Sequence, residues 1–183
     1  KKYIERSQNY INVFDWCYEI LRGKRMDGNW ESPFNPLAAG TCLVQRLQLW
    51  QYRFFVPHDV NGMIQLFGGK EEFVAALDDI FNTDAEIHGN LVDITGLIGQ
   101  YVHGNEPSHH IAYLYNYVGE PWKTQKMSRR LLNEMYHPTP EGIIGNETAG
   151  RCRHGIFFQV WDFIRFVLVA TNMFLLLPCS RKL

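Results

Sequence analysis

The sequence lacks an excess of charge of either sign. It carries 18 lysines and arginines against 19 aspartates and glutamates, a formal net charge of −1. Nothing therefore points to a nucleic acid or an anionic membrane, because such partners select basic patches. The four cysteines, Cys17, Cys42, Cys152 and Cys179, lack the spacing typical of metal sites. A nucleic-acid-binding protein and a cysteine-based metal protein are both disfavoured.

An initiator methionine and a signal-peptide pattern are also missing at the start. We therefore expect an interior piece of a longer protein, although 183 residues could form one domain with a sizeable core. The longest apolar run, residues 155–178, is interrupted by Asp162, Arg165 and Asn172. These polar residues argue against a membrane span, and we expect the run to pack poorly or aggregate.

Strand-like alternation and internal repeats are absent as well, so the pattern favours an all-α chain with long loops. Residues 22–40, rich in Gly, Pro, Asn and Asp, and residues 83–107 read as loops. Apolar periodicity, capping residues and breakers predict helices over 2–13, 58–67, 70–82, 108–118 and 121–136, the first of them imperfect.

The most informative stretch that is present is residues 95–123, TGLIGQYVHGNEPSHHIAYLYNYVGEPWK. Its polar residues gather at a loop and the positively polarised start of the helix predicted over 108–118. They are His103, Asn105, Glu106, His109 and His110. Imidazoles, an amide and a carboxylate together can hold sugar hydroxyls or a hard cation. A solvated helix cap would use the same residue types, so the stretch alone leaves both interpretations open.

The stretch resembles the sequence signature of glycoside hydrolase family 92, the calcium-dependent exo-acting α-mannosidases. Further stretches resemble the family in the same order: KKYIERSQNYINVFD (1–15), RGKRMDGNWESPFNP (22–36), WQYRFFVPHDVNGMIQLFGGKEEF (50–73), PWKTQKMSRRLLNEMY (121–136) and GNE (145–147). The resemblance implies that residues 1–147 are a fragment of the family's catalytic domain, a partial (α/α)6 barrel. The parent chain would then supply an N-terminal β-sandwich and the rest of the barrel.

The resemblance further implies an exo-acting, inverting hydrolase of α-mannosides, including N-glycan mannose, that uses Ca²⁺. Its parent would be periplasmic, cell-surface or secreted. Calcium prefers oxygen ligands, so Asn105 and Glu106 are the metal candidates. Asn105 could instead be a turn residue, and Glu106 a charge at a helix start.

Eight side chains have the chemistry to hydrogen-bond or stack on a sugar within these family-like stretches. They are Trp50, His58, Asp59, His103, His109, His110, Trp122 and Lys123. Each has a structural alternative: the tryptophans could pack in the core, Asp59 could cap a helix, and Lys123 could be solvated. At least one of the three histidines in 103–110 is expected to be structural.

Two further stretches resemble the family only in another reading frame. After Glu147 the family continues D-C-G-Q-M-S-A-W, and deletion of one base from codons for that string gives the residues found from Thr148 to Gly155. Residues 44–49 likewise decode in a neighbouring frame to T-E-A-T-A, the family's motif ahead of W-Q-Y. We therefore interpret 148–183 as a frameshifted tail without a native-like fold, with a shorter slip at 44–49. A third slip over 16–20 has weaker support.

The frame slips remove the expected catalytic groups. An inverting glycosidase needs two carboxyl groups roughly 6.5–9.5 Å apart, one as acid and one as base. The acid position falls near Gln45 and Arg46, while the acidic cluster keeps Glu147 but has Thr148 in place of an aspartate. We therefore expect the chain as written to be inactive. The alternatives are a non-catalytic descendant that binds mannosides, or a helical domain without a sugar role.

Overall fold

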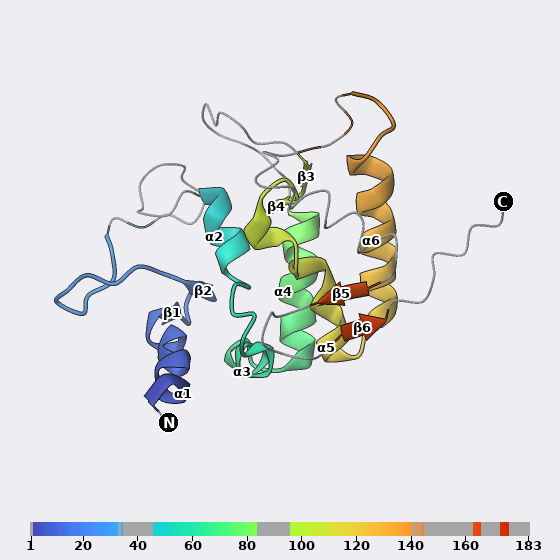
Figure 1. Ribbon diagram of the computed structural model, residues 1–183. Coiled ribbons are helices and arrows are strands. Elements are labelled where there is room, and N and C mark those ends of the chain that lie inside the picture. The colour runs from blue at the N-terminus through green and yellow to red at the C-terminus, as the bar shows by residue number, and fades with distance from the viewer. Residues whose placement is uncertain are drawn as a thin grey trace.

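The computed structural model describes residues 2–32, 34, 46–83, 96–140, 142 and 144, together with the backbone of two strands further on. In chain order the described elements are α1 (Lys2–Ser7), η1 (Gln8–Val13), β1 (Phe14–Asp15), β2 (Ile20–Leu21), α2 (Arg46–Tyr52), α3 (Val60–Leu66), α4 (Lys70–Asn82), β3 (Leu97–Ile98), β4 (Tyr101–Val102), η2 (Glu106–Ser108), η3 (Ile111–Tyr113), α5 (Tyr115–Val118), α6 (Pro121–Met135), β5 (Phe163–Arg165) and β6 (Met173–Leu175). Helices dominate this part of the chain (Figure 1).

The core joins α3 and α4 to α5, η3 and α6, where α5 contacts both α4 and α6, and η3 contacts α6 (Figure 1). Helix α4 follows Gly68 and Gly69, which both have positive φ, and carries acidic residues in its first turn. One face of it is buried, at the spacing that the sequence predicts: Phe73, Ala76, Leu77, Ile80 and Phe81. Helix α6 begins with Pro121, where a missing N–H costs nothing.

The all-α prediction is confirmed only in part, because helices prevail among the described residues but three two-stranded antiparallel ribbons are also present. Each strand has only two or three residues, too few to show alternation in the sequence. The β3–β4 ribbon sits on the end of α4, where Gln100 N donates to Ile80 O at 2.8 Å. At its turn Gly99 has φ +59°, and a Cβ there would lie 2.7 Å from Ile80 O.

Two helix predictions need correction. The helix expected over 2–13 is a short α1 continued by the 3₁₀ helix η1. In place of one helix over 108–118, the structure has the end of η2, then the 3₁₀ turn η3 and the one-turn α5. Residues 111–115 are buried on every side, so tertiary packing rather than an amphipathic face sets their conformation. Helix α2 lies where the sequence predicted no helix.

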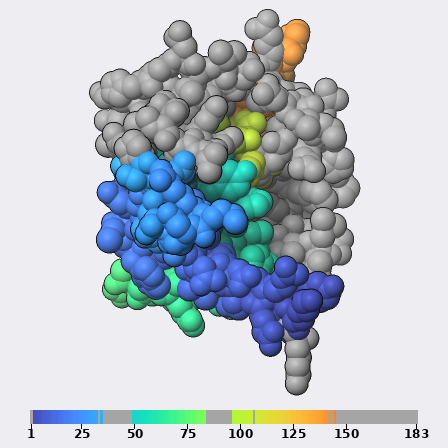
Figure 2. All heavy atoms as spheres, turned by 90° about the vertical axis from the view of Figure 1, so that its left-hand side faces the viewer, coloured from blue at the N-terminus to red at the C-terminus, as the bar shows by residue number. Residues whose placement is uncertain are grey.

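The N-terminal segment is tied to α3 by one carboxylate. Asp59 caps α3 through Oδ1, which accepts from Gly62 N at 2.9 Å. Its Oδ2 accepts from Gln8 Nε2 and from the Tyr10 hydroxyl, each at 2.9 Å. Burial raises the pKa of Asp59, but these three hydrogen bonds outweigh it and hold the pKa below its usual range. Figure 2 shows the N-terminal segment spread along one face beside α2 and α3.

A buried guanidinium links the β1–β2 ribbon to α4. Arg53 Nε and Nη2 donate to Glu19 O and Oε2 at 3.0 and 2.7 Å, while Nη1 lies 3.5 Å from Asp79 Oδ2. Glu19 has φ +51°, and the bond to its carbonyl holds this uncommon backbone conformation. The Arg53 guanidinium also lies 5.2 Å from the centre of the Phe67 ring.

Every helix among the described residues is too short or too polar to span a membrane. Most of the apolar run 155–178 lies outside the described residues. Strands β5 and β6 fall within it, paired antiparallel from Phe163–Leu175 to Arg165–Met173.

Candidate functional site

The segment of residues 103–110, called the 103–110 segment below, packs against α2. Helix α2 contacts β4, which directly precedes this segment, and η2, which lies within it. The closest polar link joins Asn105 Nδ2 to Gln51 Oε1 at 2.6 Å, and the Gln51 side chain is only 1% exposed. The amide nitrogen of Asn105 is therefore committed to the protein, and its oxygen is the atom left to serve as a ligand.

His103 is held on both sides. It is 3% exposed, its Nδ1 lies 2.8 Å from the Tyr101 hydroxyl, and its Nε2 lies 2.7 Å from the Tyr136 hydroxyl. Burial, and to a smaller extent the neighbouring His109, lowers the pKa of His103 to about 3. Both nitrogens are occupied within the protein. His103 thus fits the structural role that we expected for at least one of the three histidines.

The other two histidines are oriented by backbone carbonyls. His109 Nε2 donates to His103 O at 3.1 Å, and the two rings lie 5.4 Å apart. His110 Nε2 donates to Phe54 O at 2.8 Å, in the turn that follows α2. Burial lowers the pKa of His110, although the hydrogen bond to Phe54 opposes the shift. These contacts fix where each imidazole lies relative to Asn105.

Three predicted sugar-binding residues have structural contacts instead. His58 Nε2 donates to Ser7 O at 2.9 Å, so it joins Asp59 in anchoring the N-terminal segment. Asp59 is the α3 cap, the alternative that the sequence left open. Trp50 is half-buried against the core, with the Arg53 guanidinium 5.6 Å from its ring.

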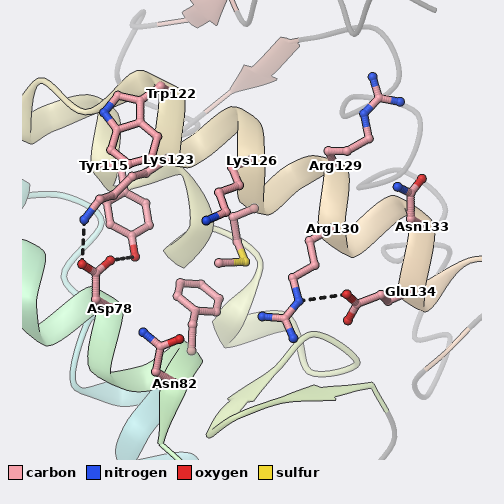
Figure 3. Close-up of a pocket in the computed structure, with 12 residues that line it drawn as sticks. Asp78, Asn82, Tyr115, Trp122, Lys123, Lys126, Arg129, Arg130, Asn133 and Glu134 are labelled. Carbon is pink, nitrogen blue, oxygen red and sulfur yellow. Dashed lines mark hydrogen bonds and ion pairs between the residues drawn. The ribbon is translucent and has the colours of Figure 1, made fainter.

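Trp122 and Lys123 line a separate cavity of about 510 Å³ between α4 and α6 (Figure 3). Lys123 Nζ lies 2.6 Å from Asp78 Oδ2, and the Tyr115 hydroxyl donates to Asp78 Oδ1 at 2.8 Å. The sequence did not indicate this ion pair of Lys123. Trp122, at 55% exposure, is not a core residue. The 103–110 segment does not line this cavity.

Several predicted site residues lie outside the described part of the structure. They are Gln45, Glu147, Thr148 and the side chains of Arg46 and Glu106. Among the described residues, no group of three or more histidine, cysteine, aspartate and glutamate side chains could hold a metal ion. Of the two predicted calcium ligands, Asn105 is the one whose side chain the structure describes.

The sequence did not single out three residues that shape this region: Gln51, Tyr101 and Tyr136. A lone glutamine after a tryptophan carries no recognisable signal, and the two tyrosines occupy positions that read as aromatic core. The cavity between α4 and α6 has a clearer signal. Lys123, Lys126 and Arg130 follow one another at helical spacing and face it from α6 (Figure 3).

Comparison with known families identifies the class of protein. The family model for the glycosyl hydrolase family 92 catalytic domain matches residues 1–177. The chain therefore belongs to glycosyl hydrolase family 92, within its catalytic domain.

Solved structures and a curated relative are consistent with this family assignment. A family 92 α-mannosidase from Bacteroides thetaiotaomicron, in complex with mannoimidazole, is 33% identical with a TM-score of 0.85, covering 97% of this chain and 24% of that one. A family 92 inverting mannosidase from the same organism is 28% identical with a TM-score of 0.69, covering 88% and 23%. An uncharacterized secreted glycosidase of Arthroderma benhamiae is 28% identical over 172 residues, covering 82% and 20%. The chain thus spans about a quarter or less of these relatives.

Proposed function

We propose that this chain is part of the catalytic domain of an exo-acting, inverting α-mannosidase that depends on Ca²⁺. The observation that carries the proposal is the packing of α2 against the 103–110 segment through Gln51 and Asn105. Residues 44–49, which run into α2, decode in a neighbouring frame to the family motif with the general acid. The 103–110 segment is the stretch that most resembles the family signature. Two segments that are far apart in the sequence thus lie together, as parts of one site must.

Likeness to mannosidases supports the substrate class. The α-mannosidase described in complex with mannoimidazole shares 33% of its aligned residues with this chain. In the proposal a mannoside lies against the 103–110 segment, with His109 and His110 held by backbone carbonyls in fixed orientations. Rigid orientation of such side chains lowers the entropy cost of binding a sugar. His103, enclosed by two tyrosines, supports the segment rather than touching the sugar.

The chemistry of Asn105 fits a calcium ligand. Its amide nitrogen donates to Gln51, so its oxygen is the atom available to a hard cation. Glu106, the next residue, would add a negative oxygen ligand, and the remaining ligands would come from outside the described residues. Bound calcium would supply positive charge for holding sugar hydroxyls. The three imidazoles are nitrogen donors, which calcium does not favour.

The acid and base positions carry the second half of the proposal. Protonation of the leaving oxygen and activation of water each require a carboxyl group. Gln45 and Arg46 lie near the acid position and Thr148 at the base position. The chain as written therefore lacks a carboxyl group at both positions. We propose that residues 148–183 are a frameshifted tail and that an intact parent is the active enzyme. A non-catalytic descendant that binds mannosides is distinguished by binding without turnover.

The test uses the full-length parent with the reading frame restored at 44–49 and after Glu147. Purified enzyme is given an aryl α-mannoside, and proton NMR follows the anomer of the mannose first released. The expected product is the inverted β-anomer, formed with Ca²⁺ and not after chelation. Retention of configuration would require a nucleophilic carboxylate about 5–5.5 Å from the acid and would overturn the proposed mechanism. Activity restricted to another sugar class would overturn the proposed substrate.

A further inference from the structure

One imidazole joins two elements that are distant in the sequence. His103 directly follows β4, which contains Tyr101, while Tyr136 directly follows α6. The hydroxyls of the two tyrosines lie 2.8 Å from Nδ1 and 2.7 Å from Nε2. The ring of Tyr136 meets that of His103 edge-on, with centroids 5.6 Å apart and planes at 87°. Both sides of the ring are therefore fixed.

The hydrogen-bond partners select one tautomer of His103. A neutral imidazole donates from one nitrogen and accepts at the other. Tyr101 is fully buried, and His103 is the one hydrogen-bond partner that its hydroxyl has among the described residues. If Tyr101 accepted from His103, its own buried O–H would be left without an acceptor, which is costly. Tyr101 therefore donates to Nδ1, and His103 donates from Nε2 to the hydroxyl of the half-buried Tyr136.

The hydrogen bond between His103 and Tyr136 connects two parts of the chain that the proposed function uses. After Tyr136 the chain makes a turn in which His137 N donates to Gly142 O at 2.9 Å, and it then leads to the Gly-Asn-Glu motif of 145–147. On the other side of the bond, His103 opens the 103–110 segment and its carbonyl orients His109. The Tyr136 hydroxyl thus joins the 103–110 segment to the stretch of chain that precedes the second motif.

We infer that Tyr136 is a positioning residue of the site proposed above: by accepting a hydrogen bond from His103 Nε2–H, it holds the 103–110 segment in register with the end of α6. The inference rests on the proposed function. It assigns no contact with the sugar to Tyr136 or to His103. It requires that loss of one hydroxyl disturb the site while the aromatic ring keeps its packing.

The hydrogen bond is tested first in the full chain without any substrate. Histidine labelled with ¹⁵N reports the tautomer through its long-range proton–nitrogen couplings. The expected result is the Nε2–H form of His103, with a protected Hε2 signal that Tyr136→Phe abolishes or shifts. Tyr101→Phe removes the donor that selects this form and should lower its share. An Nδ1–H form, or an Hε2 signal that Tyr136→Phe leaves unchanged, would overturn the inference. Thermal melts of both variants check that each is folded.

The positioning role is tested in the frame-repaired parent. Tyr136→Phe is expected to lower kcat for an aryl α-mannoside roughly 10- to 100-fold with a smaller effect on KM, as for residues that orient a site from behind. Tyr3→Phe, which removes a hydroxyl from the exposed side of α1, is the control and should keep full activity. An active parent in which Tyr136→Phe is as active as the control would overturn the inference alone. An inactive parent would overturn the proposed function and with it the positioning role, while the tautomer still decides the hydrogen-bond assignment.

Discussion

Gln51 and Asn105, 54 positions apart in the chain, share a hydrogen bond of 2.6 Å between Asn105 Nδ2 and Gln51 Oε1. We expect this bond to contribute measurably to stability because Gln51 is buried. Gln51→Leu, Asn105→Ala and the double variant form a cycle. Urea unfolding should give a coupling free energy of about 1 kcal/mol. Additive effects of the two single variants would show that the bond contributes nothing.

The chain as written is expected to have no measurable mannosidase activity. A proton donor and a base each contribute about 10²–10⁴-fold to the rate, and the residues at both positions lack the required carboxyl groups. The measurement is release of an aryl leaving group from an α-mannoside by the purified chain, with and without a chelator. Chelator-sensitive turnover by this chain would contradict both the expected inactivity and the frameshift interpretation.

Glu106→Gln in the frame-repaired parent should weaken the binding of calcium or of mannoside. The change removes a negative oxygen ligand while nearly keeping the shape of the side chain. Isothermal titration with Ca²⁺, in the presence and absence of mannoimidazole, separates the two effects. Glu71→Gln, an equivalent change on the exposed side of α4, is the matched control. Equal affinities in the two variants would show that Glu106 does not contribute to calcium or mannoside binding.

Gly99→Ala should destabilise the chain more than Gly119→Ala. Both glycines have positive φ, which costs an alanine roughly 1–2 kcal/mol. Only at Gly99 would the new Cβ meet backbone, 2.7 Å from the carbonyl oxygens of Ile80 and Phe81, whereas nothing lies within 4 Å at Gly119. Overpacking of that kind adds about 1–3 kcal/mol. Chemical unfolding of the two variants compares the costs directly, and equal losses would mean that β3–β4 is not seated on α4.

Stability should fall as the pH drops below about 6.5, and His110 should contribute to the loss. Burial lowers the pKa of His110 in the folded chain, so the unfolded chain takes up a proton first. The contribution of His110 to the free energy of unfolding is therefore fully present above the unfolded pKa of about 6.5. Below that pH the contribution falls by up to about 1.4 kcal/mol per pH unit. His110→Gln should flatten the dependence of unfolding free energy on pH between 4 and 8. The control, His137→Gln, replaces an exposed histidine, and an equal flattening there would refute the assignment.

The sequence predicted the long amphipathic helices well and the short elements poorly. The helix expected over 70–82 has those bounds in the structure, and those expected over 58–67 and 121–136 differ by at most two residues at either end. Their apolar spacing is long enough to specify a period. Strands of two residues cannot do so, and the buried run 111–115 carries no face to read. Helix α2 was missed because its first residues read as a frame slip.

The candidate site was predicted in its composition but not in its connections. The family-like stretch did gather Asn105 and the histidines on one segment that packs against α2. Nothing in the sequence indicated that His103 would be enclosed by tyrosines from β4 and the end of α6. Such contacts arise from tertiary packing between segments 33 residues apart. The ion pair of Lys123 was not predicted for the same reason, because its partner Asp78 lies on another helix.

The buried guanidinium of Arg53 limits which substitutions the chain tolerates at three positions. Its charge is shared by the carboxylates of Glu19 and Asp79, which come from the β1–β2 turn and from α4. A neutral residue at 53 would leave two negative charges facing each other, and loss of a carboxylate would leave a buried cation with half its partners. Substitutions at 53 are therefore expected to be tolerated less well than substitutions at 19 or 79, because Arg53 is buried while both carboxylates are about half exposed to solvent.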